Sequence, residues 1–417
     1  MNRFHLTLDK SNSPLMTVGT MTRKAQKRWW QFRTPLAWHN LTSEPRRLVT
    51  ALSGVSFSVV LIFVFLGFKN GLYDSQVQLI KSLNGDIFIL NRIKYTMFIP
   101  EQFARRRLYQ AQAFDGVEDA YALYIELGNW KNPLTNRTRS LRVLAFNLNE
   151  PVLELPELQH YRSQLNQPWT ALLDRRSRAE VGPQTPGLKT ELSDLQVQLL
   201  GTFTLGTDFS AGDGNVIMSD QNFVRYFGDL GPEVDSRSLE TIDIGLLQVQ
   251  PEVDVDRLAQ QIAQTLPNDV SVLTREQFIT QELTYWRENT NIGFVFSLLS
   301  SLSFVVGVIL VYQILYTDVA DHWSEYATLK AIGYSNQRLL WIVMQEALIL
   351  SVIGFIPGFL ISSLLYDLIA GATGLVLQLT LQRILNIYIA TIAMCVISGS
   401  LAMRKVLTTD PAEVFGL

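Results

Sequence analysis

The residue types that do chemistry in enzymes are few and scattered in this chain. Its four histidines, His5, His39, His160 and His322, show no HxxxH or HExxH spacing, and the single cysteine, Cys395, has no partner for a CxxC pair. Zinc sites are built from closely spaced His and Cys ligands, so the sequence predicts no metal site. No GxSxG segment for an activated serine occurs either. We therefore expect a non-catalytic chain.

The chain also lacks the residues that hold a nucleotide in most ATPases. The phosphate-binding loop requires GxxxxGK[ST], and no Gly-Lys dipeptide occurs in the 417 residues. Acidic residues within 229–256 could be imagined as calcium ligands, but the EF-hand spacing is missing, and a solvated acidic face is the simpler interpretation. We expect no cofactor on this chain and no nucleic-acid partner.

One ionisable side chain lies inside a hydrophobic segment. Glu346 follows Arg338 by about two helical turns. A carboxylate at the bilayer centre costs roughly 2.5–3.5 kcal/mol, and less near the end of a span. Two interpretations stay open. Glu346 lies near the cytoplasmic interface, hydrated or paired with a basic group, or it makes a packing or gating contact between helices.

Four long hydrophobic segments must position these residues. They run over 48–68, 289–317, 347–366 and 384–403. About 20 helical residues cross the ~30 Å hydrocarbon layer of a bilayer, because a helix rises about 1.5 Å per residue. The sequence therefore predicts four transmembrane helices in a one-plus-three arrangement, at 48–68, 289–317, 339–366 and 384–403.

The charge distribution predicts which side each connection occupies. Residues 1–47 carry nine Lys/Arg and two Asp/Glu, whereas residues 69–288 carry 21 Lys/Arg and 29 Asp/Glu. Basic residues near span ends stay cytoplasmic. The N-terminal arm and interfacial helix (1–47), the loop 318–338 and the tail 404–417 are therefore predicted to be cytoplasmic, in a plasma or inner membrane. The segment 69–288 and the short loop 367–383 are predicted to be periplasmic.

The segment 69–288 reads as an α+β domain. Strand and helix patterns alternate before and after a stretch rich in Pro and Gly at about 151–215, which predicts one domain split by an inserted subdomain. A helix is expected to begin at Pro100. Thr274 is expected to cap another helix, with Gln277 at the capping-box position. Helices over 69–83 and 274–289 are expected to continue directly into the first and second spans.

The cytoplasmic loop 318–338 has a helical pattern that ends at Gly333, a residue typical of helix C-termini. Tyr326, Leu329 and Ile332 are expected to share one apolar face. From the residues alone, a plain interfacial helix explains this pattern as well as a binding helix does.

The residues of 325–333, EYATLKAIG, followed by Gln345-Glu346-Ala347 and Gly354, resemble the core of the FtsX/MacB-type ABC transporter permeases. The C-terminal residues TDPAEV, which include Asp410, Pro411 and Glu413, resemble the closing motif of that family. The resemblance implies an FtsX-like permease region at 289–417 and a MacB-like periplasmic core, a porter part with an inserted sabre subdomain. The length of the chain and its N-terminal arm most resemble those of the DevC permeases of cyanobacterial DevBCA exporters.

The resemblance also implies partners and a mechanism. Two copies of a separate ABC ATPase (DevA-like) would bind ATP and dock on a permease homodimer. Motion would pass to the periplasmic domain and push cargo, a glycolipid in DevC systems, through a DevB-like periplasmic adaptor and a TolC-like outer-membrane channel. The residues implied to contact the ATPase are Glu325, Leu329, Lys330, Ala331, Ile332 and Gly333.

Two other classes of function are weighed against this exporter. An FtsX-like transmembrane regulator would couple the ATPase to a periplasmic enzyme, but the large loop-rich external domain suits an adaptor better. A membrane-anchored sensor or enzyme is disfavoured, because no catalytic constellation or cytoplasmic output domain is visible in the sequence.

Overall fold

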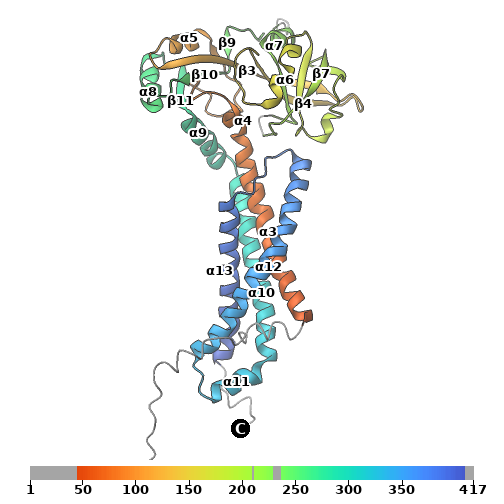
Figure 1. Ribbon diagram of the computed structural model, residues 1–417, viewed down its shortest axis with the longest axis vertical. Helices are drawn as coiled ribbons and strands as arrows, with labels where there is room; N and C mark the ends of the chain where they lie inside the picture. The colour runs from red at the N-terminus through yellow and green to blue at the C-terminus, as the bar shows by residue number, and fades with distance from the viewer. Residues whose placement is uncertain (1–44, 209–210, 229–235, 409–417) are drawn as a thin grey trace, which may run out of the picture.

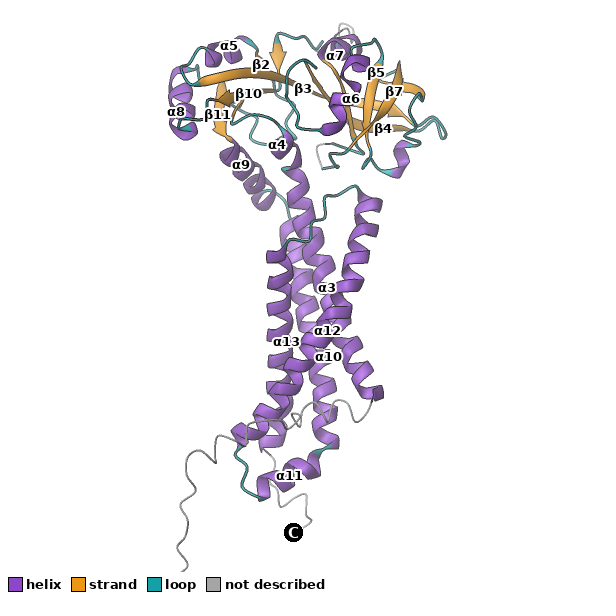
Figure 2. Cartoon of the chain, in the orientation of Figure 1, coloured by secondary structure: helices purple, strands orange, loops and turns teal. Residues whose placement is uncertain are grey.

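The computed structural model describes residues 45–208, 211–228 and 236–408. An α+β domain lies at one end of a long helical bundle, and a short helix lies at the other end (Figure 1). The strands gather in the α+β domain, away from the bundle (Figure 2). This arrangement confirms the predicted fold class, membrane-type apolar helices joined to an α+β domain.

The bundle contains four helices long and apolar enough to cross a membrane. They are α3 (Pro45–Gln76), α10 (Ile292–Asp321), α12 (Asn336–Thr373) and α13 (Leu381–Thr408). Small residues allow close packing between α3 and α12. A Cβ on Gly354 would lie 2.7 Å from Val55 Cγ1, so glycine is required for this approach.

The α+β domain, called the external domain because it lies outside the helical bundle, is built on one nine-stranded mixed sheet in the order β11-β1-β10-β3-β4-β8-β5-β7-β6. A separate pair is formed by β2 (Phe103–Ala104) and β9 (Thr241–Ile242). The strands of the large sheet are β1 (Ile87–Asn91), β3 (Val117–Lys131), β4 (Thr138–Phe146), β5 (Thr170–Asp174), β6 (Lys189–Leu192), β7 (Leu195–Phe203), β8 (Asn215–Ser219), β10 (Ile244–Val249) and β11 (Val270–Thr274).

Short helices complete the fold. Those of the external domain are α4 (Gln78–Ser82), α5 (Arg106–Gln112), α6 (Pro156–Leu165), α7 (Asp220–Phe227), α8 (Val255–Thr265) and α9 (Arg275–Glu288), with a 3-10 turn at Ala179–Val181. The short helix at the far end of the bundle is α11 (Trp323–Ala331).

The long strand β3 divides the external domain into two halves. One end of β3 pairs with β10 and the other end pairs with β4. Helices α5 and α8 pack on the first half, and α6 and α7 pack on the second. Because β4 and α7 belong to the second half, that half is larger than the predicted insert at 151–215. The larger extent arises because β3 supplies a hydrogen-bonding edge to both halves.

The helix expected to begin at Pro100 is absent, and this prediction is wrong. The chain there is extended until β2, and α5 begins only at Arg106. Side chains hold the extended backbone, since Lys94 Nζ donates to the Glu101 carbonyl (3.3 Å) and Asn91 Nδ2 donates to the Gln102 carbonyl (2.6 Å). Backbone carbonyls bound in this way are not available to an ordinary first helical turn.

The two helices expected to run unbroken into the spans are both interrupted. The helix α9 ends at Glu288, and α10 begins at Ile292. On the other side, α3 ends at Gln76 and α4 begins at Gln78. The predicted capping box is confirmed: Thr274 Oγ1 accepts from Gln277 N (3.4 Å), and Gln277 Oε1 accepts from Thr274 N (3.1 Å).

Candidate coupling site

The helix α11 lies at the end of the bundle opposite the external domain, between α10 and α12 (Figure 1). It begins after His322, whose ring Nδ1 lies 3.0 Å from the Asp318 carbonyl. It ends in a left-handed turn at Gly333, with φ +99°. Gly333 N donates to Lys330 O, and Tyr334 N donates to Leu329 O, both at 3.0 Å. The glycine C-cap expected from the sequence is therefore present.

One face of α11 is packed on three of the long helices. Tyr326 and Ala327 are buried, with only 4% and 6% of their surface exposed. They lie in an apolar cluster that joins α11 to α10, α12 and α13. Its members are Val319, Trp323, Tyr326, Leu329, Leu339, Leu340, Val343 and Met403. A displacement of α11 must therefore act on these helices, because packed side chains transmit strain.

The opposite face of α11 and its C-terminal turn are open to solvent. Ile332 is 72% exposed. Along α11 and its C-terminal turn, Glu325, Ala331 and Gly333 are also exposed, and Lys330 is half-buried. An exposed apolar side chain at this place can make a contact with a partner protein.

The prediction that Tyr326, Leu329 and Ile332 share one apolar face is only partly correct. Tyr326 and Leu329 pack on the bundle, but Ile332 does not share their face. Ile332 keeps helical dihedral angles (φ −73°, ψ −6°), and its N–H donates to the Thr328 carbonyl (3.0 Å). At 3.6 residues per turn, Ile332 lies about 120° around the helix from Tyr326, and its side chain therefore faces solvent. Of the residues implied to contact an ATPase, Leu329 is committed mainly to internal packing, and Ile332 is the most exposed.

Glu346 is fully buried on α12. Its burial argues against the hydrated form, whereas pairing with a basic group and a packing or gating contact between helices both stay open. Burial, and then the charge of Glu346, raise the pKa of the Tyr326 phenol.

The remaining predicted site residues lie outside the described part of the chain. These are Asp410, Pro411 and Glu413 of the tail motif. The N-terminal arm and most of its predicted interfacial helix also lie outside the described residues. The roles assigned to these segments therefore stay predictions.

Sequence reasoning missed a second junction, between the loop after α12 and the external domain. Thr207 N donates to the Gly374 carbonyl (3.2 Å), and Thr207 Oγ1 donates to the Thr373 carbonyl (3.3 Å). Val376 N donates to Ser75 Oγ on α3 (3.0 Å). The end of α12 is therefore fixed both to the segment after β7 and to α3.

The geometry at Gly374 shows how tight this second junction is. Its φ is +72°, and a Cβ there would lie 2.5 Å from the Arg176 carbonyl oxygen. Beside it, Arg383 of α13 forms an ion pair with Asp74 of α3 (2.7 Å). In the sequence, Gly374 was the one feature that marked this junction. A glycine after a long apolar helix indicates that the helix ends, but it does not indicate which segment the helix end contacts.

The external segment that receives α12 is itself held firmly. Asp174, at the end of β5, is fully buried. It accepts hydrogen bonds from Leu205 N (3.2 Å), Gly206 N (2.8 Å) and Asn215 Nδ2 (2.8 Å). The residues that meet Gly374 are thus tied to the sheet of the second half.

These features define a class of protein: a helical membrane protein with an external α+β domain at one end and an exposed packed helix at the other. Residues 297–411 match the family model described as FtsX-like permease C-terminal. The C-terminal membrane region is therefore similar to the C-terminal region of FtsX-like permeases. The matched residues include most of α10 and all of α11, α12 and α13.

Two curated relatives are similar to part of the chain. They are uncharacterized ABC transporter permeases of Mycobacterium tuberculosis, from strains CDC 1551 and H37Rv. Each is 22% identical over 120 residues, which is 29% of this chain and 33% of the relative. The match thus spans about a third of the length of these relatives.

Two solved structures are similar to the external domain. The periplasmic region of MacB from Actinobacillus actinomycetemcomitans aligns with 51% of this chain and 96% of its own, at 10% identity and a TM-score of 0.33. The extracellular domain of the noncanonic ABC-type transporter YknZ from Gram-positive bacteria aligns with 46% of this chain and 99% of its own, at 10% identity and a TM-score of 0.31.

Proposed function

We propose that this chain is the permease subunit of a tripartite ABC exporter. A separate ABC ATPase docks on α11, and ATP-driven motion of that partner moves the external domain. The external domain then pushes cargo through a periplasmic adaptor and an outer-membrane channel. The chain itself does not hydrolyse ATP in this proposal, and the cargo is glycolipid if the resemblance to DevC permeases extends to substrate.

The observation that carries this proposal is the continuity of α12. This helix runs as one element from Asn336, beside α11, to Thr373, beside the external domain. Its 38 residues span about 57 Å at ~1.5 Å per residue. The first turns pack against α11 through Leu339 and Val343, and the last residues are bonded to Thr207. A push on α11 is thereby delivered to the external domain.

The charge of the N-terminal arm supports the proposed orientation, and the number of nucleotide sites supports the proposed assembly. The basic N-terminal arm favours a cytoplasmic location for the N-terminus, and an even number of spans returns the C-terminus to the same side. The end that carries α11 then faces the ATPase. We infer a homodimer in the inner membrane, because two nucleotide sites require two permease half-sites.

The test uses the exposed residue of the coupling site. Ile332→Asp should leave the fold intact, because the side chain is 72% exposed, but it should place a charge in the apolar contact with the ATPase. We expect co-purification of the ATPase with the tagged full chain to fall at least tenfold, as for loss of about 1.4 kcal/mol or more.

The matched control is Leu134→Asp, which alters an equally exposed leucine (77%) in the external domain. This variant should retain the ATPase. If both variants recover the same amount of ATPase, α11 is not the docking site of the ATPase. Mass spectrometry of the same preparations separates the exporter from its alternative. An adaptor among the recovered proteins supports the exporter, whereas a cell-wall enzyme in its place supports an FtsX-like regulator.

A further inference from the structure

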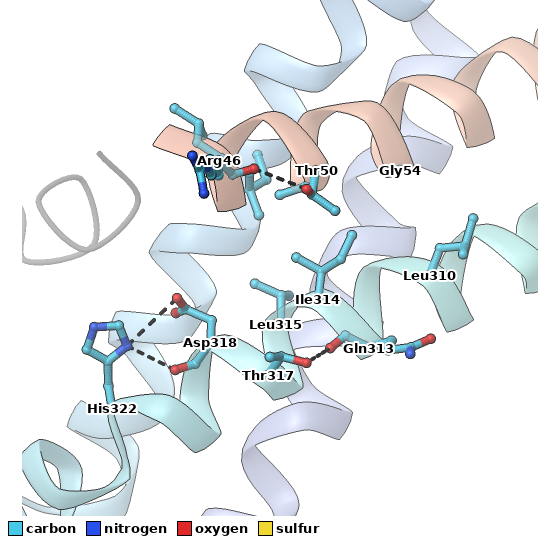
Figure 3. Close-up of a pocket in the computed structure, with 13 residues that line it drawn as sticks. Arg46, Thr50, Gly54, Leu310, Gln313, Ile314, Leu315, Thr317, Asp318 and His322 are labelled. Atoms are coloured by element: carbon cyan, nitrogen blue, oxygen red, sulfur yellow. Dashed lines mark hydrogen bonds and ion pairs between the residues drawn. The ribbon is translucent and has the colours of Figure 1, made fainter. Parts of the chain in front are cut away.

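A cavity of about 590 Å³ opens between the first turns of α3 and the last turns of α10 (Figure 3). It lies at the end of the bundle that carries α11. Gly54 and Ile314 narrow its inner end, since a Cβ on Gly54 would lie 3.0 Å from Ile314 Cδ1. The size is within the range of ordinary ligand sites, roughly 300–1,000 Å³.

The cavity changes in character along its length. Its inner wall is apolar, with Leu48, Ala51, Leu310, Ile314 and Leu350. Polar groups lie at its mouth on two opposite walls: Arg46 on α3, and Asp318 on α10 with His322, which follows α10 (Figure 3). An apolar interior with a charged rim matches an amphiphile better than it matches water or a small polar metabolite.

The depth of the cavity corresponds to one leaflet of a bilayer. Arg46 and Gly54 are eight residues apart on α3, or about 12 Å along the helix axis. Half of the ~30 Å hydrocarbon layer is about 15 Å. The mouth therefore lies at the level of lipid headgroups when α3 and α10 span the membrane, and the inner wall lies at the level of the acyl chains.

We propose that this cavity binds one anionic phospholipid with a hydroxylated headgroup, from the leaflet on the α11 side. The phosphate lies on the Arg46 guanidinium, which forms no ion pair with another described residue. A headgroup hydroxyl donates to the Asp318 carboxylate on the opposite wall, which also lies 3.8 Å from the His322 ring. One acyl chain occupies the apolar wall. Asp318 disfavours a second anionic group, so phosphatidylglycerol suits the site.

This site does not depend on the proposed exporter function. A lipid held between α3 and α10 would fill the gap at the point where the first span meets the helix that leads into α11. The lipid would thus support the packing of the coupling end of the bundle, whichever cargo or partner the external domain serves.

The experiment is native mass spectrometry of the full chain in detergent, titrated with phosphatidylglycerol or with phosphatidylcholine. We expect one phosphatidylglycerol molecule to bind per chain, in preference to phosphatidylcholine, which has no headgroup hydroxyl and carries a quaternary ammonium. Arg46→Gln should weaken phosphatidylglycerol binding about tenfold, the effect expected for loss of a charge-assisted hydrogen bond. Arg338→Gln, at the start of α12 and outside the cavity, should leave binding unchanged.

A second variant tests the cavity itself. Thr50 is exposed and lines the site, so Thr50→Trp should fill the cavity without disturbing the core and should abolish the bound lipid. Unchanged binding in Arg46→Gln or in Thr50→Trp would overturn the proposal, and so would equal binding of the two lipids. Disulfide-linked dimers of a Gln313→Cys variant, made in a Cys395→Ala background, would also overturn the proposal. They would show that a second copy of the chain occupies the groove.

Discussion

At the scale of single residues, position within α11 separates two similar side chains. Leu329 and Ile332 are both large and apolar and lie three residues apart, yet Leu329 packs on the bundle and Ile332 points to solvent. The prediction placed them on one face because residues three apart are neighbours on a helix, but the direction turns by about 120° from Tyr326 through Leu329 to Ile332. A charge at position 329 would damage internal packing, so only position 332 tests a contact with a partner.

Gly374 offers a residue-scale prediction. Gly374→Ala should loosen the junction between α12 and the external domain. The new Cβ would meet the Arg176 carbonyl oxygen at 2.5 Å, in a backbone conformation that costs a non-glycine residue about 1–2 kcal/mol. We expect faster hydrogen exchange at the amide of Thr207, measured on the full chain, while ATPase binding at α11 persists.

The control for this variant is Gly187→Ala. Gly187 also has a positive φ, +85°, but a Cβ there would meet nothing within 4 Å. It therefore carries the backbone strain without the clash, and exchange at Thr207 should stay slow. If both variants behave alike at Thr207, the contact at Gly374 does not fix the external domain.

At the scale of elements, features set by residues close in the sequence were predictable, and contacts between residues far apart in the sequence were not. The capping box at Thr274 was predictable because its partners lie three residues apart. The four apolar helices were predictable because hydrophobic length alone defines them. The bond from Thr207 Oγ1 to the Thr373 carbonyl at the end of α12 joins residues 166 positions apart, and no local pattern encodes it.

The break between α9 and α10 was missed for a related reason. No Pro or Gly lies between Glu288 and Ile292, so this segment contains no recognised helix breaker. In the structure, the side chains of Asn289 and Thr290 instead bond carbonyls of the preceding turn, at Tyr285 and Trp286. Such side-chain bonds compete with helix propagation.

The cap of α9 supplies an element-scale prediction. Thr274→Ala removes the side-chain acceptor at the N-terminus of this helix and should destabilise it by about 1 kcal/mol. The expected result is a lower midpoint in thermal unfolding of the full chain, followed by tryptophan fluorescence, since Trp286 lies on the same helix. Thr265→Ala serves as the control, because the Thr265 hydroxyl only bonds a carbonyl at the exposed end of α8. A midpoint equally low in the control would show that the cap is not the cause.

At the scale of the whole molecule, two ends about 57 Å apart are joined by α12. At one end the cluster around Tyr326 and Leu339 ties α12 to α11. At the other end Gly374 is bonded to the segment held by Asp174. The helices α3 and α4 are separated at Val77, and α9 and α10 are separated by residues 289–291. The helix α12 is therefore the more continuous connection between the two ends.

The central claim is that an ATPase at α11 moves the external domains of a permease pair. Its most direct test is an electron spin resonance distance between spin labels at Leu134→Cys, one on each copy, in a Cys395→Ala background. The measurement uses the complex with the ATPase, with and without trapped ATP. We predict that ATP shifts the distance between the external domains, and that adding Ile332→Asp abolishes the shift. A distance that is the same with and without ATP in the intact complex would contradict the account.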